Sequence, residues 1–259
     1  QNILFKISKK KILLDISTCS LYLKNILKRK NKIIEKIDPI HFLKSIKNTK
    51  EIKNTVDTHL KDGVALTKFL FWVKNNFEKK RITEISAQTK LESLRKKNIT
   101  YKFPSFDTIS GTGPNSAIIH YRASSKTNRV LKKGDLYLVD SGGQYNFGTT
   151  DVTRTISLGN QSNYIKEIYT RVLKGHIAVS KFQIKKNTTG SEVDKNARKF
   201  LRKINLDYPH GTGHGVGYFL NVHEGPQSLS KNNKINLRNG MIVSNEPGYY
   251  KEGKLGIRI

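Results

Sequence analysis

Cysteine is almost absent from this chain of 259 residues, since Cys19 is the single one. One cysteine cannot form a disulfide within the chain, which excludes the small disulfide-stapled scaffolds, and this usage is typical of a reducing compartment such as the cytoplasm. Long apolar runs are lacking as well. The most apolar stretch, residues 69–73, is flanked by Lys68 and Lys74 and is far shorter than the roughly 20 residues of a membrane helix. We therefore expect no membrane partner.

Acidic residues are scarce, with 20 Asp and Glu against 48 Lys and Arg, so that the formal net charge is +28. A charge of this size on one face would attract nucleic acid or an anionic membrane. The basic clusters are instead scattered, in a chain that is rich in lysine, isoleucine and asparagine throughout, which is typical of a compositional bias. We therefore expect no nucleic-acid partner. Aromatic residues at 9% and hydrophobic residues at 36% predict a folded core.

The first part of the chain is patterned differently from the rest. A short apolar run at residues 11–16 predicts a strand, and a basic, weakly patterned stretch follows it. From Thr49 onward Ile52, Val56 and Leu60 recur at helical spacing, which predicts a long amphipathic helix. Because the first residue is Gln1 and not methionine, we expect a fragment in which residues 1–46 are the end of a preceding domain and residues 47–259 are a second one.

Helices and strands both recur in the second domain. Helices are predicted at residues 83–97, 165–179 and 193–204, the last with a capping pair formed by Ser191 and Asp194. Residues 103–116 are predicted to be irregular, and strands are predicted at residues 117–121, 136–139, 151–156, 241–244 and 256–259. A turn-rich segment at residues 144–148 joins two of these strands as a hairpin, which favours an α+β fold over a parallel doubly wound sheet.

Two aspartates, Asp140 and Asp151, flank this predicted turn. A turn centred between Tyr145 and Asn146 places position 140 directly opposite position 151 in an antiparallel hairpin. Opposed carboxylates repel each other, and both ionise cheaply only where a cation or a shared proton lies between them. We interpret the pair as candidate metal ligands, against the commoner alternative that each Asp is a solvated turn or strand-end residue.

Two further candidate ligands lie nearer the C-terminus. His214 stands among glycines at alternate positions from 211 to 217, which permit close backbone approach and unusual dihedral angles. This loop lacks the Lys-Ser/Thr ending of a phosphate-binding loop, so we set a nucleotide site aside. Glu246 follows an apolar strand, where its carboxylate can point into a cleft. Each is weak evidence alone, because a single histidine is more often structural and a single glutamate is more often on the surface.

Taken together, these segments resemble the pita-bread metallopeptidases, a family that includes methionine aminopeptidase, prolidase and aminopeptidase P. The resemblance rests on Asp140-Ser-Gly-Gly-Gln-Tyr, Asp151-Val-Thr-Arg-Thr, His210-Gly-Thr-Gly-His214-Gly-Val-Gly, Asn221-Val-His223-Glu224-Gly-Pro226 and Asn245-Glu246-Pro247-Gly248. The segments at residues 113–121 and 173–180 look like the cytosolic, three-domain form of Xaa-Pro aminopeptidase. The similarity runs from about residue 48 to the C-terminus, with its motifs in the family's order.

The resemblance implies a pita-bread (creatinase/aminopeptidase) fold, with a curved, mostly antiparallel sheet flanked by helices. It also implies that Asp140, Asp151, His214 and Glu246 bind two divalent metal ions. An oxygen-rich site with one imidazole suits Mn²⁺ first, with Co²⁺ or Zn²⁺ as alternatives. In the family the fifth ligand, a glutamate, directly follows a Gly-Ile-Arg-Ile segment, which here is residues 256–259. We expect glutamate after Ile259 in the complete protein, and weak metal binding and little activity from the 259 residues alone.

Catalytic roles are likewise implied by the resemblance. His120, His223 and His210 match family positions that line the substrate cleft and stabilise developing charge, and Glu246 is expected to accept the proton of the attacking water. Arg258 is expected to support a metal-binding carboxylate with help from Tyr250. The remaining histidines, His41, His59 and His176, are interpreted as structural.

The function implied is metal-dependent removal of an N-terminal residue that precedes proline, by a cytoplasmic homodimer. A prolidase-type dipeptidase shares the ligands and is the nearest alternative, whereas a methionine aminopeptidase fits the motif around His223 less well. A catalytically inactive pita-bread domain that serves as a binding module is an alternative from a different class, and retention of the four ligands argues against it.

Overall fold

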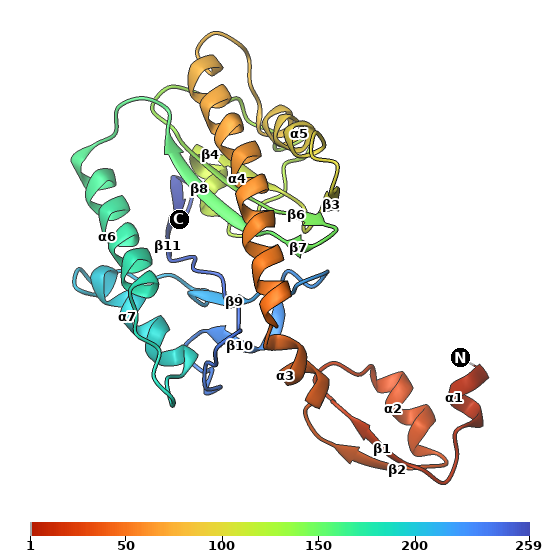
Figure 1. The fold of residues 1–259 in the computed structure, drawn as a ribbon. Coiled ribbons are helices and arrows are strands. Elements are labelled where there is room, and N and C mark those ends of the chain that lie inside the picture. The colour runs from red at the N-terminus through yellow and green to blue at the C-terminus, as the bar shows by residue number, and fades with distance from the viewer. Residues whose placement is uncertain (1) are drawn as a thin grey trace. The chain divides into compact units, whose positions relative to one another are not determined.

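The computed structural model describes residues 2–259 and divides the chain into two units between Lys44 and Ser45 (Figure 1). In the first unit the two strands pair in parallel, with Ile12 opposite Ile33. Ser20 caps the second helix by accepting a hydrogen bond from the backbone N–H of Leu23. The elements up to the start of the second unit are α1 (Asn2–Lys6), β1 (Lys11–Leu14), α2 (Leu21–Lys28), β2 (Lys32–Glu35) and α3 (Pro39–Ser45).

Four long helices and a short 3₁₀ turn belong to the second unit. The first begins at a capping box, in which the Asn48 side chain accepts from the Glu51 N–H and the Glu51 carboxylate accepts from the Asn48 N–H. The second begins in the same way after Thr83. The helices are α4 (Thr49–Asn76), α5 (Glu84–Arg95), η1 (Gly113–Ala117), α6 (Asn163–Ser180) and α7 (Gly190–Arg202).

The strands of the second unit pair antiparallel and form small sheets ordered β4-β5-β8, β3-β6-β7, β9-β10 and β11-β12. Antiparallel strands together with helices confirm the predicted α+β class. The strands are β3 (Tyr101–Pro104), β4 (Ile109–Thr112), β5 (Leu136–Ser141), β6 (Gly143–Tyr145), β7 (Gly148–Thr149), β8 (Val152–Ser157), β9 (Gly213–Gly215), β10 (Glu224–Leu229), β11 (Gly248–Lys251) and β12 (Leu255–Arg258).

Strand β5 is buried along its whole length because hydrophobic side chains cover both of its faces. Tyr137 and Val139 belong to the core that α4 and α5 build, with Phe69 among its largest members. Leu136 belongs to a second core that contains Ile168 of α6 and residues of α7, β11 and β12. Side chains alternate along a strand, so Asp140 shares the face of Leu136 and points away from the core under α4 and α5.

Several element predictions near the site were wrong. Residues 103–116 are more regular than expected, since they include β4 and η1. The strand predicted at residues 117–121 is not among the strands described for residues 2–259. Gly113, with φ of 53°, starts a 3₁₀ turn there that reaches Ala117. Residues 241–244 make isolated bridges, Met241 with Ile46 and Val243 with Gly215, where a strand was predicted.

The predicted capping pair of α7 was also wrong. The N-cap of this helix is Thr189, and the helix begins at Gly190. Asp194 is buried and accepts hydrogen bonds from Thr212 and Arg198. Asp194 has the spacing expected of a residue at a helix start, but its side chain binds Thr212 in a distant loop and does not cap the helix.

Within residues 2–259, none of the helices combines the length and apolar character that crossing a membrane requires.

Candidate active site

The hairpin that carries Asp140 and Asp151 has a different register from the predicted one. Asp140 lies opposite Thr153, and the pairing of Tyr145 with Gly148 leaves Asn146 and Phe147 as the turn. The turn is thus centred one residue later than predicted, and the expectation that positions 140 and 151 are directly opposed is corrected. A shift of two residues in the partner preserves the face of the sheet, so Asp151 remains on the side of Asp140, diagonally across.

The misleading residue is Gly148, which was counted as part of the turn. A Cβ atom on Gly148 would lie 2.8 Å from Oγ1 of Thr58 on α4, so this glycine allows close packing of the hairpin against the helix. Gly142 likewise allows close packing on the other strand, because a Cβ atom on it would lie 1.8 Å from the Thr150 carbonyl oxygen. Both glycines bring the backbone close enough to place Thr150, and hence Asp151, beside the strand of Asp140.

A second antiparallel contact places Glu246 beside His214. The Glu246 N–H donates to the Thr212 carbonyl at 2.7 Å, and the Ser244 N–H donates to the His214 carbonyl at 2.8 Å. Glu246 is therefore also a diagonal neighbour of His214 on one face. The glycine loop permits this approach, as predicted, since a Cβ on Gly213 would lie 2.0 Å from the Ser244 carbonyl oxygen.

All four predicted ligands and the three predicted catalytic histidines line one cavity of about 400 Å³. The wall also contains apolar residues that the sequence did not single out, and Asp107 and Arg122 form an exposed ion pair at this cavity. The lining residues are Phe106, Asp107, Ile109, Ile119, His120, Arg122, Asp140, Asp151, His210, Gly211, Gly213, His214, Val222, His223, Glu246 and Arg258.

The imidazole of His214 is oriented as a metal ligand would be. Its Nδ1 lies 2.9 Å from the Gly215 carbonyl oxygen, which can only accept, so the network assigns the proton to Nδ1. Nε2 lies 3.1 Å from Asp151 Oδ2 and 3.1 Å from Glu246 Oε1, but within residues 2–259 it has no partner with hydrogen-bond geometry. Potential ligand atoms of these three residues lie within 4.8 Å of one another.

Charge in this cluster calls for a cation. Burial, together with the negative charges of Asp140 and Glu246, raises the pKa of Asp151 to about 6. Burial lowers the pKa of His214, but its contacts with Asp151 and Glu246 outweigh that effect and raise the pKa to about 10. Asp140 Oδ1 is buried and is without a hydrogen-bond partner in the described chain. Three carboxylates and one imidazole nitrogen, from which a bound cation would displace the proton, fit an oxygen-preferring divalent cation.

A chain of hydrogen bonds connects Asp140 with His210. Arg258 Nη2 donates to Asp140 Oδ2 at 2.7 Å, and Arg258 Nη1 donates to the Tyr250 hydroxyl at 2.8 Å. The Tyr250 hydroxyl is 2.7 Å from His210 Nε2, and His210 Nδ1 is 2.7 Å from the Gly211 carbonyl oxygen. Arg258 therefore binds a candidate ligand directly, and Tyr250 binds Arg258.

His223 and His120 line the cavity, and both are exposed. The rings of His214 and His223 are 4.0 Å apart between centroids. Burial, and next the charge of His214, lowers the pKa of His223. A largely neutral imidazole at this position can both donate and accept a hydrogen bond.

One polar contact of the cluster was missed from sequence. Ser244 donates from Oγ to Glu246 Oε1 at 2.5 Å and accepts from the His214 N–H at 2.9 Å. It thereby connects two candidate ligands that are 32 residues apart in the chain. Its position two residues before Glu246, on the same face of an extended segment, was the available signal.

Comparison with known proteins gives one family and many relatives. The family model for metallopeptidase family M24 matches residues 56–259. Xaa-Pro aminopeptidase 1 of Dictyostelium discoideum is 46% identical over 236 residues, which are 88% of this chain and 38% of that protein. A probable Xaa-Pro aminopeptidase P of Laccaria bicolor is 48% identical over 225 residues, or 85% of this chain and 35% of that protein. The chain thus spans well under half of these relatives.

Solved structures agree with the sequence comparison. An X-prolyl aminopeptidase from Caenorhabditis elegans, described as a cytosolic enzyme with a di-nuclear active site, matches with a TM-score of 0.88 and 36% identity, covering 96% of this chain and 41% of that one. The prolidase from Pyrococcus furiosus matches with a TM-score of 0.86 and 29% identity, covering 100% of this chain and 74% of that one. These matches confirm the pita-bread fold that the motifs predicted, and the chain belongs to metallopeptidase family M24.

Proposed function

We propose that the complete protein is a metal-dependent aminopeptidase that removes the N-terminal residue from peptides with proline in the second position. The observation that carries this proposal is the convergence of Asp140, Asp151, His214 and Glu246 on one cavity. Relatives named Xaa-Pro aminopeptidase, at 46% and 48% identity, support this peptide class more strongly than a prolidase at 29% does.

The proposed metal ligands are Asp140, Asp151, His214 and Glu246, and the proposed ions are two Mn²⁺, with Co²⁺ or Zn²⁺ as alternatives. Divalent ions held by these residues supply Lewis acidity toward a carbonyl and make water more acidic. The Nδ1–H of His214 is engaged by Gly215, which leaves Nε2 for a cation. Arg258 holds Asp140 in one orientation through Oδ2 and leaves Oδ1 free.

The remaining residues act on the substrate and its protons. Glu246 lines the cavity, and its carboxylate, which accepts a hydrogen bond from Ser244, is placed to accept a proton from water. His120 and His223 donate hydrogen bonds to the oxygen on which charge develops, and the His210 ring, whose nitrogens bind Gly211 and Tyr250, orients the peptide by contact with the face of the ring. Ile109, Ile119 and Val222 give the cavity an apolar wall for the proline ring.

Cleavage specificity tests the proposed activity. The complete protein, supplied with Mn²⁺, should release arginine from Arg-Pro-Pro peptides, and mass spectrometry should show the shortened product. A prolidase would cleave Xaa-Pro dipeptides and leave the longer peptides intact. A binding module would cleave neither substrate and would bind no metal, as measured by elemental analysis.

His223→Ala tests the role of the outer histidine. In the complete protein we expect kcat to fall about 100-fold or more, because a hydrogen bond to the developing charge is lost. Metal content should stay near that of the wild type, since His223 is exposed and lies outside the ligand cluster. A variant that loses its metal would mean that His223 is a ligand.

The domain boundaries, the location in the cell and the oligomeric state of the protein are also proposals. We propose that residues 1–46 end a preceding non-catalytic domain and that residues 47–259 belong to the catalytic domain. A cytoplasmic homodimer is supported by the family resemblance and by the C. elegans relative, which is described as cytosolic. Sedimentation of the complete protein would separate a dimer from a monomer.

A further inference from the structure

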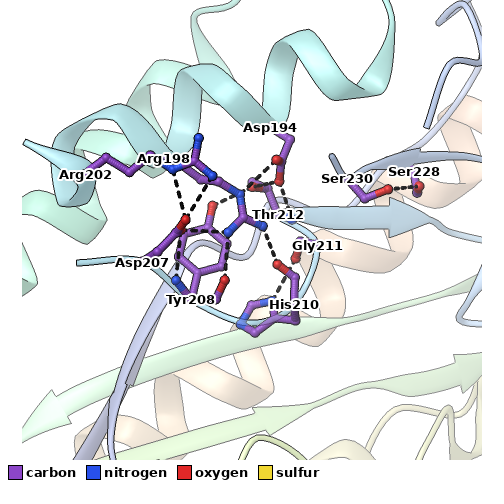
Figure 2. A network of polar contacts seen from close by, with 10 residues as sticks. All are labelled: Asp194, Arg198, Arg202, Asp207, Tyr208, His210, Gly211, Thr212, Ser228 and Ser230. Carbon is purple, nitrogen blue, oxygen red and sulfur yellow. Dashed lines mark hydrogen bonds and ion pairs between the residues drawn. The ribbon is translucent and has the colours of Figure 1, made fainter. Parts of the chain in front are cut away.

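A buried arginine of α7, Arg198, holds the backbone of the segment that carries His210 (Figure 2). Its Nε donates to Asp194 Oδ2 at 2.8 Å. Its Nη1 donates to Asp207 Oδ1 and to the Tyr208 carbonyl oxygen, each at 2.7 Å, and its Nη2 donates to the His210 carbonyl oxygen. The guanidinium carbon also lies 4.0 Å from the centroid of the Tyr208 ring. One side chain thus binds the segment at three of its residues, Asp207, Tyr208 and His210.

Asp194, one turn before Arg198 on α7, holds the other end of the segment. Its Oδ1 accepts hydrogen bonds from Thr212 Oγ1 at 2.7 Å and from the Thr212 N–H at 3.2 Å. Figure 2 shows both side chains reaching from the helix to the loop, where Arg198 contacts His210 and Asp194 contacts Thr212. Two buried, hydrogen-bonded charges of α7 therefore hold the loop at His210 and at Thr212.

The hydrogen bonds of the His210 ring assign its tautomer. The Gly211 carbonyl oxygen can only accept, so His210 Nδ1, at 2.7 Å, carries the proton. The Tyr250 hydroxyl accepts from Arg258 and donates its own proton to His210 Nε2. Burial, the largest cause, lowers the pKa of His210, which agrees with a neutral ring. A displaced loop would break this relay, which continues through Arg258 to Asp140.

A neighbouring arginine, Arg202, contacts Asp207 as Arg198 does and serves as a comparison for it. Arg202, on the next turn of α7, donates from Nε to Asp207 Oδ2 at 2.9 Å. Its side chain is 46% exposed, against 7% for Arg198. The hydrogen bonds described for Arg202 reach Asp207 and none of the backbone carbonyls that Arg198 holds. The two arginines share one partner and differ in their link to His210.

We propose that Arg198 is a positioning residue, which sets the place and the tautomer of His210 and so aligns His210, Tyr250 and Arg258 with the metal-binding carboxylates. The proposal rests on the proposed peptidase function for its effect on turnover, and on the contacts alone for its effect on His210. Lysine cannot replace Arg198, because an ammonium lacks the planar fork that reaches two carbonyls and two carboxylates at once.

A double-mutant cycle in the complete protein with Mn²⁺ tests the link. Arg198→Lys should lower kcat about 10- to 100-fold, as small misplacements of a catalytic group do, with metal content unchanged. In a His210→Asn background the same change should cost less than about twofold, since the group through which Arg198 acts is gone. Arg202→Met, the matched control, should leave kcat unchanged. Equal losses in both backgrounds would overturn the proposal.

Nuclear magnetic resonance of the histidine rings gives a readout that does not depend on activity. The wild type should show His210 as the Nδ1–H tautomer, with the signal assigned by its loss in His210→Asn. Arg198→Lys should convert it to a mixture of tautomers, and Arg202→Met should not. An unchanged His210 signal in Arg198→Lys would contradict the proposal even if turnover fell. If the wild type cleaves no peptide, the proposed function fails while this spectrum still decides the positioning role.

Asp194→Asn provides a second variant in case Arg198→Lys does not fold. It removes the charge that orients Arg198 and weakens the bond to Thr212, with almost no change in side-chain volume. The same loss of kcat and the same mixture of His210 tautomers are expected, and a wild-type spectrum would count against the proposal.

Discussion

Replacing His214 with alanine in the complete protein is expected to remove most of the bound divalent metal and to lower kcat/KM at least about a thousand-fold. A metal bound at this site would stabilise the transition state by several kcal/mol, and each 1.36 kcal/mol corresponds to a factor of ten in the rate. Among the described residues, His214 supplies the imidazole of the cluster with Asp151 and Glu246, and its Nε2 lies 3.1 Å from an oxygen of each carboxylate. Metal content is measured by elemental analysis and binding by titration calorimetry.

The matched control is His59→Ala, because His59 lies on α4 and its ring binds the Thr55 carbonyl oxygen of the same helix. This variant should keep its metal and its turnover. A His214→Ala protein that retains both would show that the cluster is not the metal site.

Arg95→Met is expected to destabilise the fold by about 3–5 kcal/mol, the usual effect of removing one partner of a buried ion pair. Arg95 on α5 donates to both carboxylate oxygens of Asp62 on α4, at 2.7 and 3.0 Å. Both residues are buried, and Tyr145 also donates to Asp62 at 2.6 Å. The variant would leave the Asp62 charge with a hydroxyl as its remaining partner in this cluster. The free energy of unfolding in urea measures the effect.

Two comparisons make the Arg95 result specific. Lys96 follows Arg95 in the chain and forms an exposed ion pair with Glu92. Lys96→Met removes this pair and should lower the free energy of unfolding by less than about 1 kcal/mol. The double variant Asp62→Leu with Arg95→Met should recover much of the loss, because neither charge is then buried. Similar losses in Lys96→Met and Arg95→Met would refute the assignment of the effect to burial.

Long helices of this chain were predictable from local signals, although those signals do not all report packing. The helix from Thr49 has a capping box at Asn48 and apolar residues at helical spacing, but Ile52, Val56 and Leu60 are exposed in the structure. The strand predicted at residues 117–121 failed, because Gly113 starts a compact turn through η1 and the segment that carries His120 follows it. Apolar composition over a few residues does not distinguish a strand from a buried irregular segment.

At the site, the identity of the gathered residues was predictable and their register was not. Asp140, Asp151, His214 and Glu246 were chosen from sequence, and the cavity contains all four. The direct opposition of Asp140 and Asp151 was wrong, because Gly148 packs against α4 and lies outside the turn. The role of Asp194 was hidden for a similar reason, since its partner Thr212 is 18 residues away. Long-range partners leave no periodic trace in the sequence.

Two diagonal pairs, Asp140 with Asp151 and His214 with Glu246, meet across antiparallel segments. Along such segments a deletion of one residue turns every following side chain to the opposite face. Deleting a residue between Gly148 and Asp151 would thus point one carboxylate away from the cavity, whereas lengthening the turn at Asn146 and Phe147 would leave the pairing intact. Insertions at the hairpin tip should therefore leave the site intact, whereas deletions only a few residues away, beside the cavity, should disrupt it.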